Sequence, residues 1–192
     1  LAGAGLWLLQ EIRGAGGSTV HLDYSVTTPT LPGGGTGVAI DLADVRYNPH
    51  PTTVGCYKNS IHLSYEPVGA SPLALALSML GDRVLARMHA LRSVAVFSQA
   101  SCTAGSVVLR NYQLSYLPDA DTHLPRLQSV HVLGRADTPE RSTAVPVASY
   151  TYGSASSGGK LTYRPAQTSA LGFSLVGSTT SSTSPMPPGR GP

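Results

Sequence analysis

Histidine is the side chain most often used for acid–base chemistry and metal binding near neutral pH, and the chain contains six of them. No two stand at the His-x-x-x-His spacing that places two metal ligands on one face of a helix. His21, His62 and His131 each alternate with apolar residues, which predicts the polar face of a β-strand. The histidines therefore predict surface positions rather than a metal site.

Two short motifs match catalytic or nucleotide-binding patterns only in part. The run Gly-Gly-Gly-Thr-Gly at residues 33–37 has the glycine content of a phosphate-binding loop. It lacks the Gly-Lys-Ser/Thr ending, and a strand pattern rather than a helix follows it. Ser157 and Lys160 have the spacing of a nucleophile and its base, but the two glycines between them favour a turn. Both motifs are interpreted as hairpin turns.

The acidic residues Asp119 and Asp121 flank a single alanine and suggest a calcium loop. A calcium site needs about 6 to 8 oxygen ligands, and few other carboxylates stand nearby, so a turn is the favoured interpretation. No Gly-x-Ser-x-Gly marks a nucleophile. The sequence therefore predicts no catalytic residue, no cofactor and no metal ion.

The two cysteines, Cys56 and Cys102, lie 46 residues apart, a spacing that fits no metal-binding motif. Two interpretations remain open from the sequence. The thiols form one disulfide in an oxidising compartment, or they are two buried free thiols.

Composition limits the protein classes to consider. The 192 residues are 41% hydrophobic but only 12% charged, and they include 21 glycines and 15 prolines. This composition excludes a coiled coil, which needs long runs rich in charged residues, alanine and leucine. No apolar run approaches the ~20 residues of a membrane-spanning helix. The 13 basic residues are scattered along the chain and the net charge is only +3, so we expect no nucleic-acid partner.

The most informative pattern is a repeated Leu-x-Tyr triplet, followed in three of its four copies by a proline two residues later. Leucine and tyrosine at alternate positions share one face of a strand, and proline ends a strand because it lacks the N–H donor. We interpret these residues as a structural repeat: Leu22 and Tyr24; Leu63, Tyr65 and Pro67; Leu114, Tyr116 and Pro118; Leu161, Tyr163 and Pro165.

A second pattern alternates with the first along the chain. The six residues from Leu91 to Val96 match those from Leu127 to Val132 as Leu-x-Ser-Val-x-Val. Together the two patterns predict a mainly β fold, with about eight to ten antiparallel strands joined in hairpins and a meander. Residues 73–90 are ambiguous. A short helix or an irregular loop is the expectation there, although Leu73, Leu75, Leu77 and Met79 also alternate like a strand.

The domain organisation follows from composition. Residues 1–173 are predicted to form the antiparallel β segment. Residues 174–192 are predicted to be a linker or tail, because 14 of the last 16 residues are glycine, serine, threonine or proline. The sequence begins with Leu1 rather than methionine, and no basic stretch precedes its first apolar residues as in a signal peptide. We therefore expect the chain to be cut from a longer polypeptide. With nine tyrosines but only two phenylalanines and one tryptophan, the tyrosine-lined face is expected to border water or another module.

The order of strand-like segments resembles the Rhs/YD-repeat shell proteins, in particular the N-terminal to middle region of insecticidal toxin complex B components and the Salmonella virulence plasmid B-type proteins. The resemblance covers roughly residues 6 to 153. The segments that carry it are Trp7–Ile12, Thr19–Tyr24, Asp44–Tyr47, Ile61–Pro67, Leu91–Val96, Leu109–Tyr116, Arg126–Val130 and Pro146–Tyr152.

The resemblance implies a bacterial, secreted virulence protein in which this segment is part of a hollow β shell. Such a shell encloses the toxic C-terminal part of a partner subunit or of the same polypeptide. It further implies an adjoining β-propeller and gives this segment no catalytic residue. The alternative is a stand-alone extracellular β-sandwich that binds a carbohydrate or a cell surface. A shell fragment would leave sheet edges unpaired, so we predict that the isolated chain self-associates.

Overall fold

The computed structural model describes residues 6–31, 33–67, 74–135, 137–154, 156–157 and 160–161. Its described part is mainly β and antiparallel, as the alternating pattern predicts. The chain divides into two units, residues 1–154 and residues 155–192. The first unit contains the large sheet.

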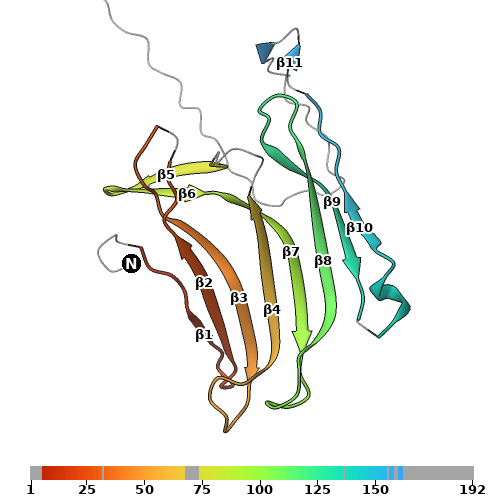
Figure 1. Cartoon of the computed structure of the whole chain (residues 1–192). Coiled ribbons are helices and arrows are strands. Elements are labelled where there is room, and N and C mark those ends of the chain that lie inside the picture. Colours follow the sequence, from red (N-terminus) through yellow and green to blue (C-terminus); the bar gives the residue numbers. More distant parts are fainter. Residues whose placement is uncertain are drawn as a thin grey trace, which may run out of the picture. The chain divides into compact units, whose positions relative to one another are not determined.

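Eight strands of the first unit form one antiparallel sheet, and their order in space is their order along the chain (Figure 1). A sequential order lets each strand pair with the strand that precedes it, so the sheet is a meander with one insertion. The strands are β1 (Glu11–Arg13), β2 (Thr19–Thr27), β3 (Ala39–Pro49), β4 (Tyr57–Pro67), β7 (His89–Ser98), β8 (Val107–Pro118), β9 (Pro125–Leu133) and β10 (Val145–Ser149).

The insertion between β4 and β7 is a separate hairpin of β5 (Ala76–Leu80) and β6 (Arg83–Arg87). The expectation of a helix or an irregular loop near residues 73–90 is therefore wrong for the described residues 74–90. Gly81 takes a positive φ of 61° in the turn, a conformation that glycine adopts without steric cost. The alternation of apolar residues, rather than their helical spacing, was the correct indication.

The hairpin packs against the beginning of β3, where the main hydrophobic cluster of the described residues lies. Val38 bridges to Leu85, and Ala39, Ala86 and Met88 are 2%, 5% and 9% exposed. Leu31 packs against this cluster. Among the described residues, no large side chain is fully buried. The cluster therefore anchors one end of the sheet but does not form a core beneath it.

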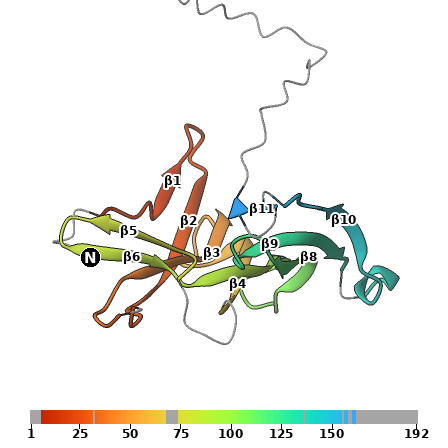
Figure 2. The same cartoon turned by 90° about the horizontal axis from the view of Figure 1, so that it is seen from above.

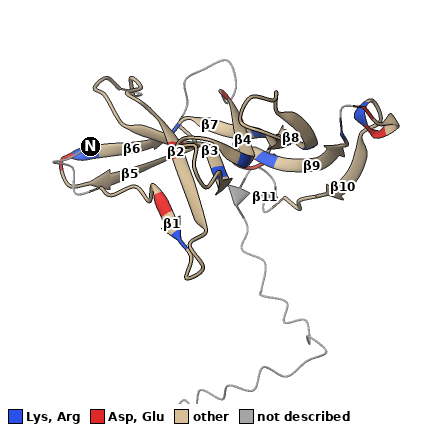
Figure 3. Ribbon diagram, turned by 90° about the horizontal axis from the view of Figure 1, so that it is seen from below, with Lys and Arg blue, Asp and Glu red and all other residues tan. Residues whose placement is uncertain are grey.

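The sheet itself is a single layer, as the view along its strands shows (Figure 2). Most described residues of its longer strands are half-buried rather than buried, because no described second sheet or helix covers either face. Figure 3 shows that most of the ribbon lacks charged residues, and it places an acidic and a basic residue together on β1. These are Glu11 and Arg13, which form an ion pair.

The short 3₁₀ turn Pro139–Arg141 connects β9 to β10. In the second unit, β11 (Ser156–Ser157) pairs with β12 (Lys160–Leu161), and Ser157 lies opposite Lys160. That pairing agrees with the hairpin interpretation of this motif. The boundary predicted between residues 173 and 174 lies outside the described residues. A search of the described residues found no helix with the length and apolar character needed to cross a membrane.

Candidate functional site

The most regular feature of the sheet is a set of four hydrogen bonds from tyrosine side chains to leucine backbone carbonyls. Each hydroxyl donates to the leucine of the preceding strand segment at 2.8 or 2.9 Å, and we call each of these a Tyr–Leu contact. The four are Tyr24 Oη to Leu9 O, Tyr65 Oη to Leu42 O, Tyr116 Oη to Leu91 O and Tyr152 Oη to Leu127 O.

These contacts divide the sheet into four repeating units of two strands. In each unit the first strand, or the segment leading into it, supplies the leucine, and we call it the Leu strand. The second strand, or the segment after it, supplies the tyrosine, and we call it the Tyr strand. The units are β1 with β2, β3 with β4, β7 with β8, and β9 with β10. The two alternating sequence patterns are therefore the two strands of one unit.

Neighbouring units meet in the same way each time, and we call this arrangement a junction. At the three junctions, a tyrosine of one unit lies directly opposite the leucine of the next unit: Tyr24 opposite Leu42, Tyr65 opposite Leu91, and Tyr116 opposite Leu127. Each of these leucines also accepts the tyrosine hydroxyl of its own unit. A continuous row of alternating tyrosines and leucines thus crosses the sheet.

Every junction also contains a one-residue bulge at the same place. The register shifts between the residue before the tyrosine and the tyrosine itself, so one residue of the Leu strand is left without a partner. The extra residue directly follows the leucine in each case and is Ala43, Arg92 or Gln128. A bulge increases the local twist and bends the strand that carries it. The repeat thus builds a bend into each junction.

The predicted repeat residues are found largely where the sequence places them. The triplets at Leu22, Leu63 and Leu114 lie on Tyr strands, and β4 and β8 end at Pro67 and Pro118. Leu161 instead lies in β12, in the second unit. Tyr163 and Pro165 are outside the described residues.

In the fourth unit, the place of the Leu-x-Tyr triplet is taken by Tyr150-Thr151-Tyr152, which directly follows β10. The first two leucines of the row, Leu9 and Leu42, were also not recognised from the sequence. A search for leucine followed three residues later by isoleucine or valine would have found both, since Ile12 and Val45 stand at that position.

The partial burial of Tyr65 and Tyr116 changes the acidity of their hydroxyls. Partial burial raises the pKa of the Tyr65 hydroxyl, and the nearby Asp41 charge raises it further, against a smaller opposing effect of the Arg87 charge. Burial likewise raises the pKa of Tyr116, with a further contribution from Glu66. Both hydroxyls therefore stay protonated, and remain donors, at neutral pH.

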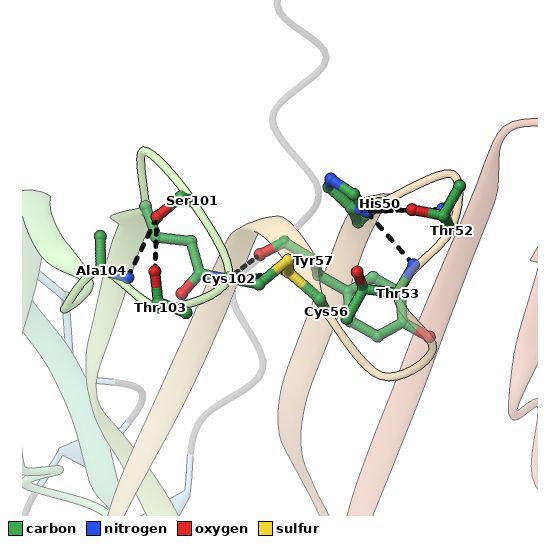
Figure 4. The surroundings of a disulfide bond; sticks show 10 residues. His50, Thr52, Thr53, Cys56, Tyr57, Ser101, Cys102, Thr103 and Ala104 are labelled. Atoms are coloured by element: carbon green, nitrogen blue, oxygen red, sulfur yellow. Dashed lines mark hydrogen bonds between the residues drawn. A yellow bond between two sulfur atoms is a disulfide. The ribbon is translucent and has the colours of Figure 1, made fainter.

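A disulfide joins Cys56, just before β4, to Cys102, in the loop between β7 and β8 (Figure 4). Of the two alternatives left open by the sequence, the structure has the bonded form. Beside it, the His50 ring accepts hydrogen bonds from the backbone N–H groups of Thr52 and Thr53 at 3.4 and 3.2 Å. The disulfide therefore ties two loops at the same end of the sheet.

Asp119 organises the turn between β8 and β9. Its side chain is only 4% exposed and accepts hydrogen bonds from the backbone N–H groups of Asp121 and Thr122 and from the Thr122 hydroxyl. Arg126 lies 2.8 Å from its other oxygen. Burial by itself would raise the pKa of this carboxyl, but these hydrogen bonds and Arg126 together lower it. Both carboxylate oxygens of Asp119 thus have partners within or beside the turn, which agrees with the interpretation of this segment as a turn.

The Arg126 guanidinium also lies over the ring of Tyr152, 5.0 Å from the ring centre. These two residues, with Tyr150 and the Asp119 turn, border an open hollow of about 350 Å³. Tyr150 and Tyr152 are 44% and 50% exposed. Of the four tyrosines that make Tyr–Leu contacts, Tyr152 is the exposed one, and the other three are half-buried.

The strand histidines lie on the polar face, as predicted, where His62 pairs with the neighbouring strand and His21 and His131 contact residues of their own strands. His62 contacts Asp44 at 2.8 Å, and His131 lies 3.3 Å from the Ser129 hydroxyl. His21 lies 3.4 Å from Asp23. Within the described ranges, no three histidine, cysteine or acidic side chains gather as a metal site would require.

The repeated units, rather than any cluster of reactive side chains, are the distinctive feature of this sheet. Neither a scan against protein-family models nor a search of curated proteins finds a match for the chain.

Proposed function

We propose that the chain is a non-catalytic structural segment of a large secreted toxin-complex or Rhs-type protein. In this role it forms part of a β shell that encloses or delivers a toxic C-terminal cargo. The observation that carries the proposal is the single-layered sheet of four repeating units, in which the described residues include no fully buried large side chain.

Among the described residues, no large side chain is fully buried beneath the sheet, and this distinguishes the wall of a shell from a β-sandwich. A β-sandwich buries the inner faces of two sheets against each other, about 10 Å apart. Here the strands form one layer, and most of their residues are half-buried. Backbone hydrogen bonds, the Tyr–Leu contacts and polar pairs between neighbouring strands stabilise this layer instead. Arg46 with Asp23 and Ser115 with Ser129 are examples of such pairs. A wall that meets water on one side and cargo on the other suits this pattern.

The repeating units also suit the wall of a shell, because further units can be added to the sheet. Each unit pairs with the next through the same junction, so a sheet of this kind lengthens without a change in its local structure. A bend at every junction, caused by the bulge, curves the layer as it lengthens. Curvature in one direction is what an enclosing surface requires.

Reading the gene on both sides of this segment is the first test. The proposal expects the reading frame to continue into further strands with the Tyr-strand and Leu-strand patterns. Sedimentation of the purified 192-residue chain is the second test, and we expect concentration-dependent self-association because its sheet edges are unpaired. A monodisperse monomer that melts cooperatively contradicts the proposal.

A second candidate, a stand-alone extracellular binding module, is favoured by one observation. Tyr150 and Tyr152 are half-exposed beside the hollow near Asp119, and exposed aromatic rings are common in carbohydrate sites. A screen of soluble glycans against the chain tests this candidate. Binding that is lost in Tyr150→Ala would support the module, and the absence of any bound glycan would remove it.

A further inference from the structure

We propose that the outer edge of β10 is a docking edge for one more Leu strand, which pairs antiparallel with its leucine opposite Tyr152. The inference rests on the proposed function, since it names the partner that continues the wall. It is carried by the three junctions, because each internal Tyr strand has a Leu strand on its outer side. β10 is the Tyr strand for which no described strand fills that place.

The inner side of β10 already has the repeat geometry. Tyr152 makes the Tyr–Leu contact with Leu127, and the N–H of Tyr150 donates to Gln128 O at 2.8 Å. In the first unit, the N–H of Leu22 donates to Gln10 O at 2.8 Å. Leu22 and Tyr150 both stand two residues before the unit's tyrosine. β10 is thus oriented as the other Tyr strands are.

This orientation fixes which groups of β10 face outward. N–H groups alternate between the two sides of a strand, and the N–H of Tyr150 points inward to β9. The N–H of Ser149 therefore points to the open side. Ser149 is equivalent to His62 of β4, since each stands three residues before the tyrosine of its unit. His62 lies opposite Ala95 of β7, so the N–H of Ser149 would face the equivalent residue of an incoming strand.

The strand lengths indicate that β10 is incomplete. β2, β4 and β8 each continue two or three residues beyond their repeat tyrosine. β10 ends at Ser149, three residues before Tyr152. Val145 and Val147 on this strand are also 47% and 53% exposed. A strand paired on the outer edge would extend β10 through Tyr152 and cover part of this apolar surface.

The three internal Leu strands define the chemistry of the partner. Each carries leucine, then an acidic or hydroxyl residue two positions later, then valine at the third position. They read Leu42-Ala43-Asp44-Val45, Leu91-Arg92-Ser93-Val94 and Leu127-Gln128-Ser129-Val130. The partner is therefore an extended polypeptide strand with the pattern Leu-x-(Asp/Ser)-Val and one bulged residue after the leucine.

A synthetic peptide with the sequence of residues 89–98, labelled with a fluorophore, tests the inference by anisotropy against the full 192-residue chain. The titration uses a chain concentration below that at which copies associate. We expect saturable binding, which is weakened about tenfold or more by Ser149→Pro because the outward N–H is removed. Ser149→Ala keeps the N–H and is expected to bind as the unmodified chain does.

The register is tested by disulfide trapping, since Cys56 and Cys102 are bonded and the chain has no free cysteine. In the β4–β7 junction, Ser64 lies opposite Ser93, and Thr151 is the equivalent of Ser64. The chain with Thr151→Cys should trap the peptide with Ser93→Cys about tenfold faster than the peptide with Val96→Cys.

Three results overturn the inference: no peptide binding at the highest chain concentration at which copies of the chain stay apart, equal binding to the Ser149→Pro chain, or equal trapping at both peptide positions. These are distinct from failure of the proposed function. A self-associating chain that does not bind the peptide contradicts only the docking edge, whereas a cooperative, monodisperse monomer contradicts the shell itself.

Discussion

At the scale of single residues, the tyrosine hydroxyl has the most consequential role in this sheet. The carbonyl oxygen of each leucine in the four Tyr–Leu contacts accepts a hydrogen bond from a tyrosine hydroxyl, which adds to the backbone hydrogen bonds between the strands. The partly buried phenol gains a partner for its polar group, without which burial of a hydroxyl is costly. The same side chain therefore supplies apolar area and tethers one strand to the next. Four of the chain's nine tyrosines have this double role in the described part of the sheet.

Replacing Tyr65 or Tyr116 by phenylalanine is expected to lower the free energy of unfolding by about 1 kcal/mol each, the usual net value of one hydrogen bond. Tyr47→Phe is the matched control, because no hydrogen bond of its hydroxyl is found among the described residues. Denaturant unfolding at pH 7 provides the measurement. A loss in the control equal to that in the two variants would show that the Tyr–Leu contacts do not stabilise the sheet.

The raised pKa values of these tyrosines predict a dependence of stability on alkaline pH. A raised pKa in the folded state means that the stabilising contribution is complete below the unfolded value of about 10. It is then lost as pH rises through the folded value. Melting temperatures between pH 8 and pH 11 should fall more steeply for the unmodified chain than for the Tyr65→Phe, Tyr116→Phe double variant.

Asp119 predicts the opposite dependence, at acid pH. Its pKa lies below its ordinary value of 3.8, so its contribution is present above about pH 4 and is lost as pH falls through the folded value. Asp119→Asn should lower the melting temperature at pH 6 but show a smaller further decrease between pH 5 and pH 2. Parallel melting curves for both proteins over that range would contradict the assigned role of the carboxylate.

At the scale of elements, the hairpin of β5 and β6 shows what a local pattern decides. Its residues fit a helical face and a strand alternation equally well, and the glycine in the middle is compatible with a helix break or a turn. The positive φ of Gly81 and the bridge from Val38 to Leu85 decide the matter. The bridge could not be predicted from a local stretch of sequence, because it joins residues 47 positions apart.

Gly81→Ala is expected to destabilise this hairpin by about 1 kcal/mol, because an alanine side chain disfavours a positive φ. No atom lies within 4 Å of the place that a Cβ at residue 81 would occupy, so the cost is conformational and not a clash. Gly81→Asn should cost less, since asparagine tolerates this region. Hydrogen exchange of the β5 and β6 amides measures the effect, and equal losses for both variants would exclude the conformational explanation.

The element scale also shows how far sequence reasoning reached. The Leu-x-Tyr triplets lie on three of the four Tyr strands, because a period of two is a local property, and a following proline marks the end of two of them, β4 and β8. The pairing of each tyrosine with a distant leucine carbonyl was not accessible in this way. The contact joins positions 15 to 25 residues apart, and its recognition requires the register of the strands. The fourth copy was missed because Tyr150 replaces the leucine of the triplet.

At the scale of the whole molecule, the disulfide between Cys56 and Cys102 links parts of the described chain that are far apart in the sequence. It closes a loop of 46 residues that contains β4, β7 and the inserted hairpin. A sheet without a buried core beneath it depends more strongly on such constraints, since apolar burial supplies less of its stability.

Replacing both Cys56 and Cys102 by serine is expected to reduce the free energy of unfolding by about 4 kcal/mol, the chain-entropy value for a loop of this length. Denaturant unfolding with and without a reducing agent measures this. Reduction should lower the stability of the unmodified chain to that of the double variant and leave the variant unchanged. Equal stability of the oxidised chain and the variant would contradict a stabilising role.

The inserted hairpin has a consequence for how such a protein diversifies. It interrupts the chain between β4 and β7, which belong to different units, and the junction of Tyr65 with Leu91 is nevertheless intact. New sequence added at a boundary between units leaves each unit's own tyrosine and leucine in place, whereas an addition inside a unit would separate them. Evolution can therefore lengthen, decorate or shorten such a protein in steps of two strands, and the connections between units are where variation between lineages should accumulate.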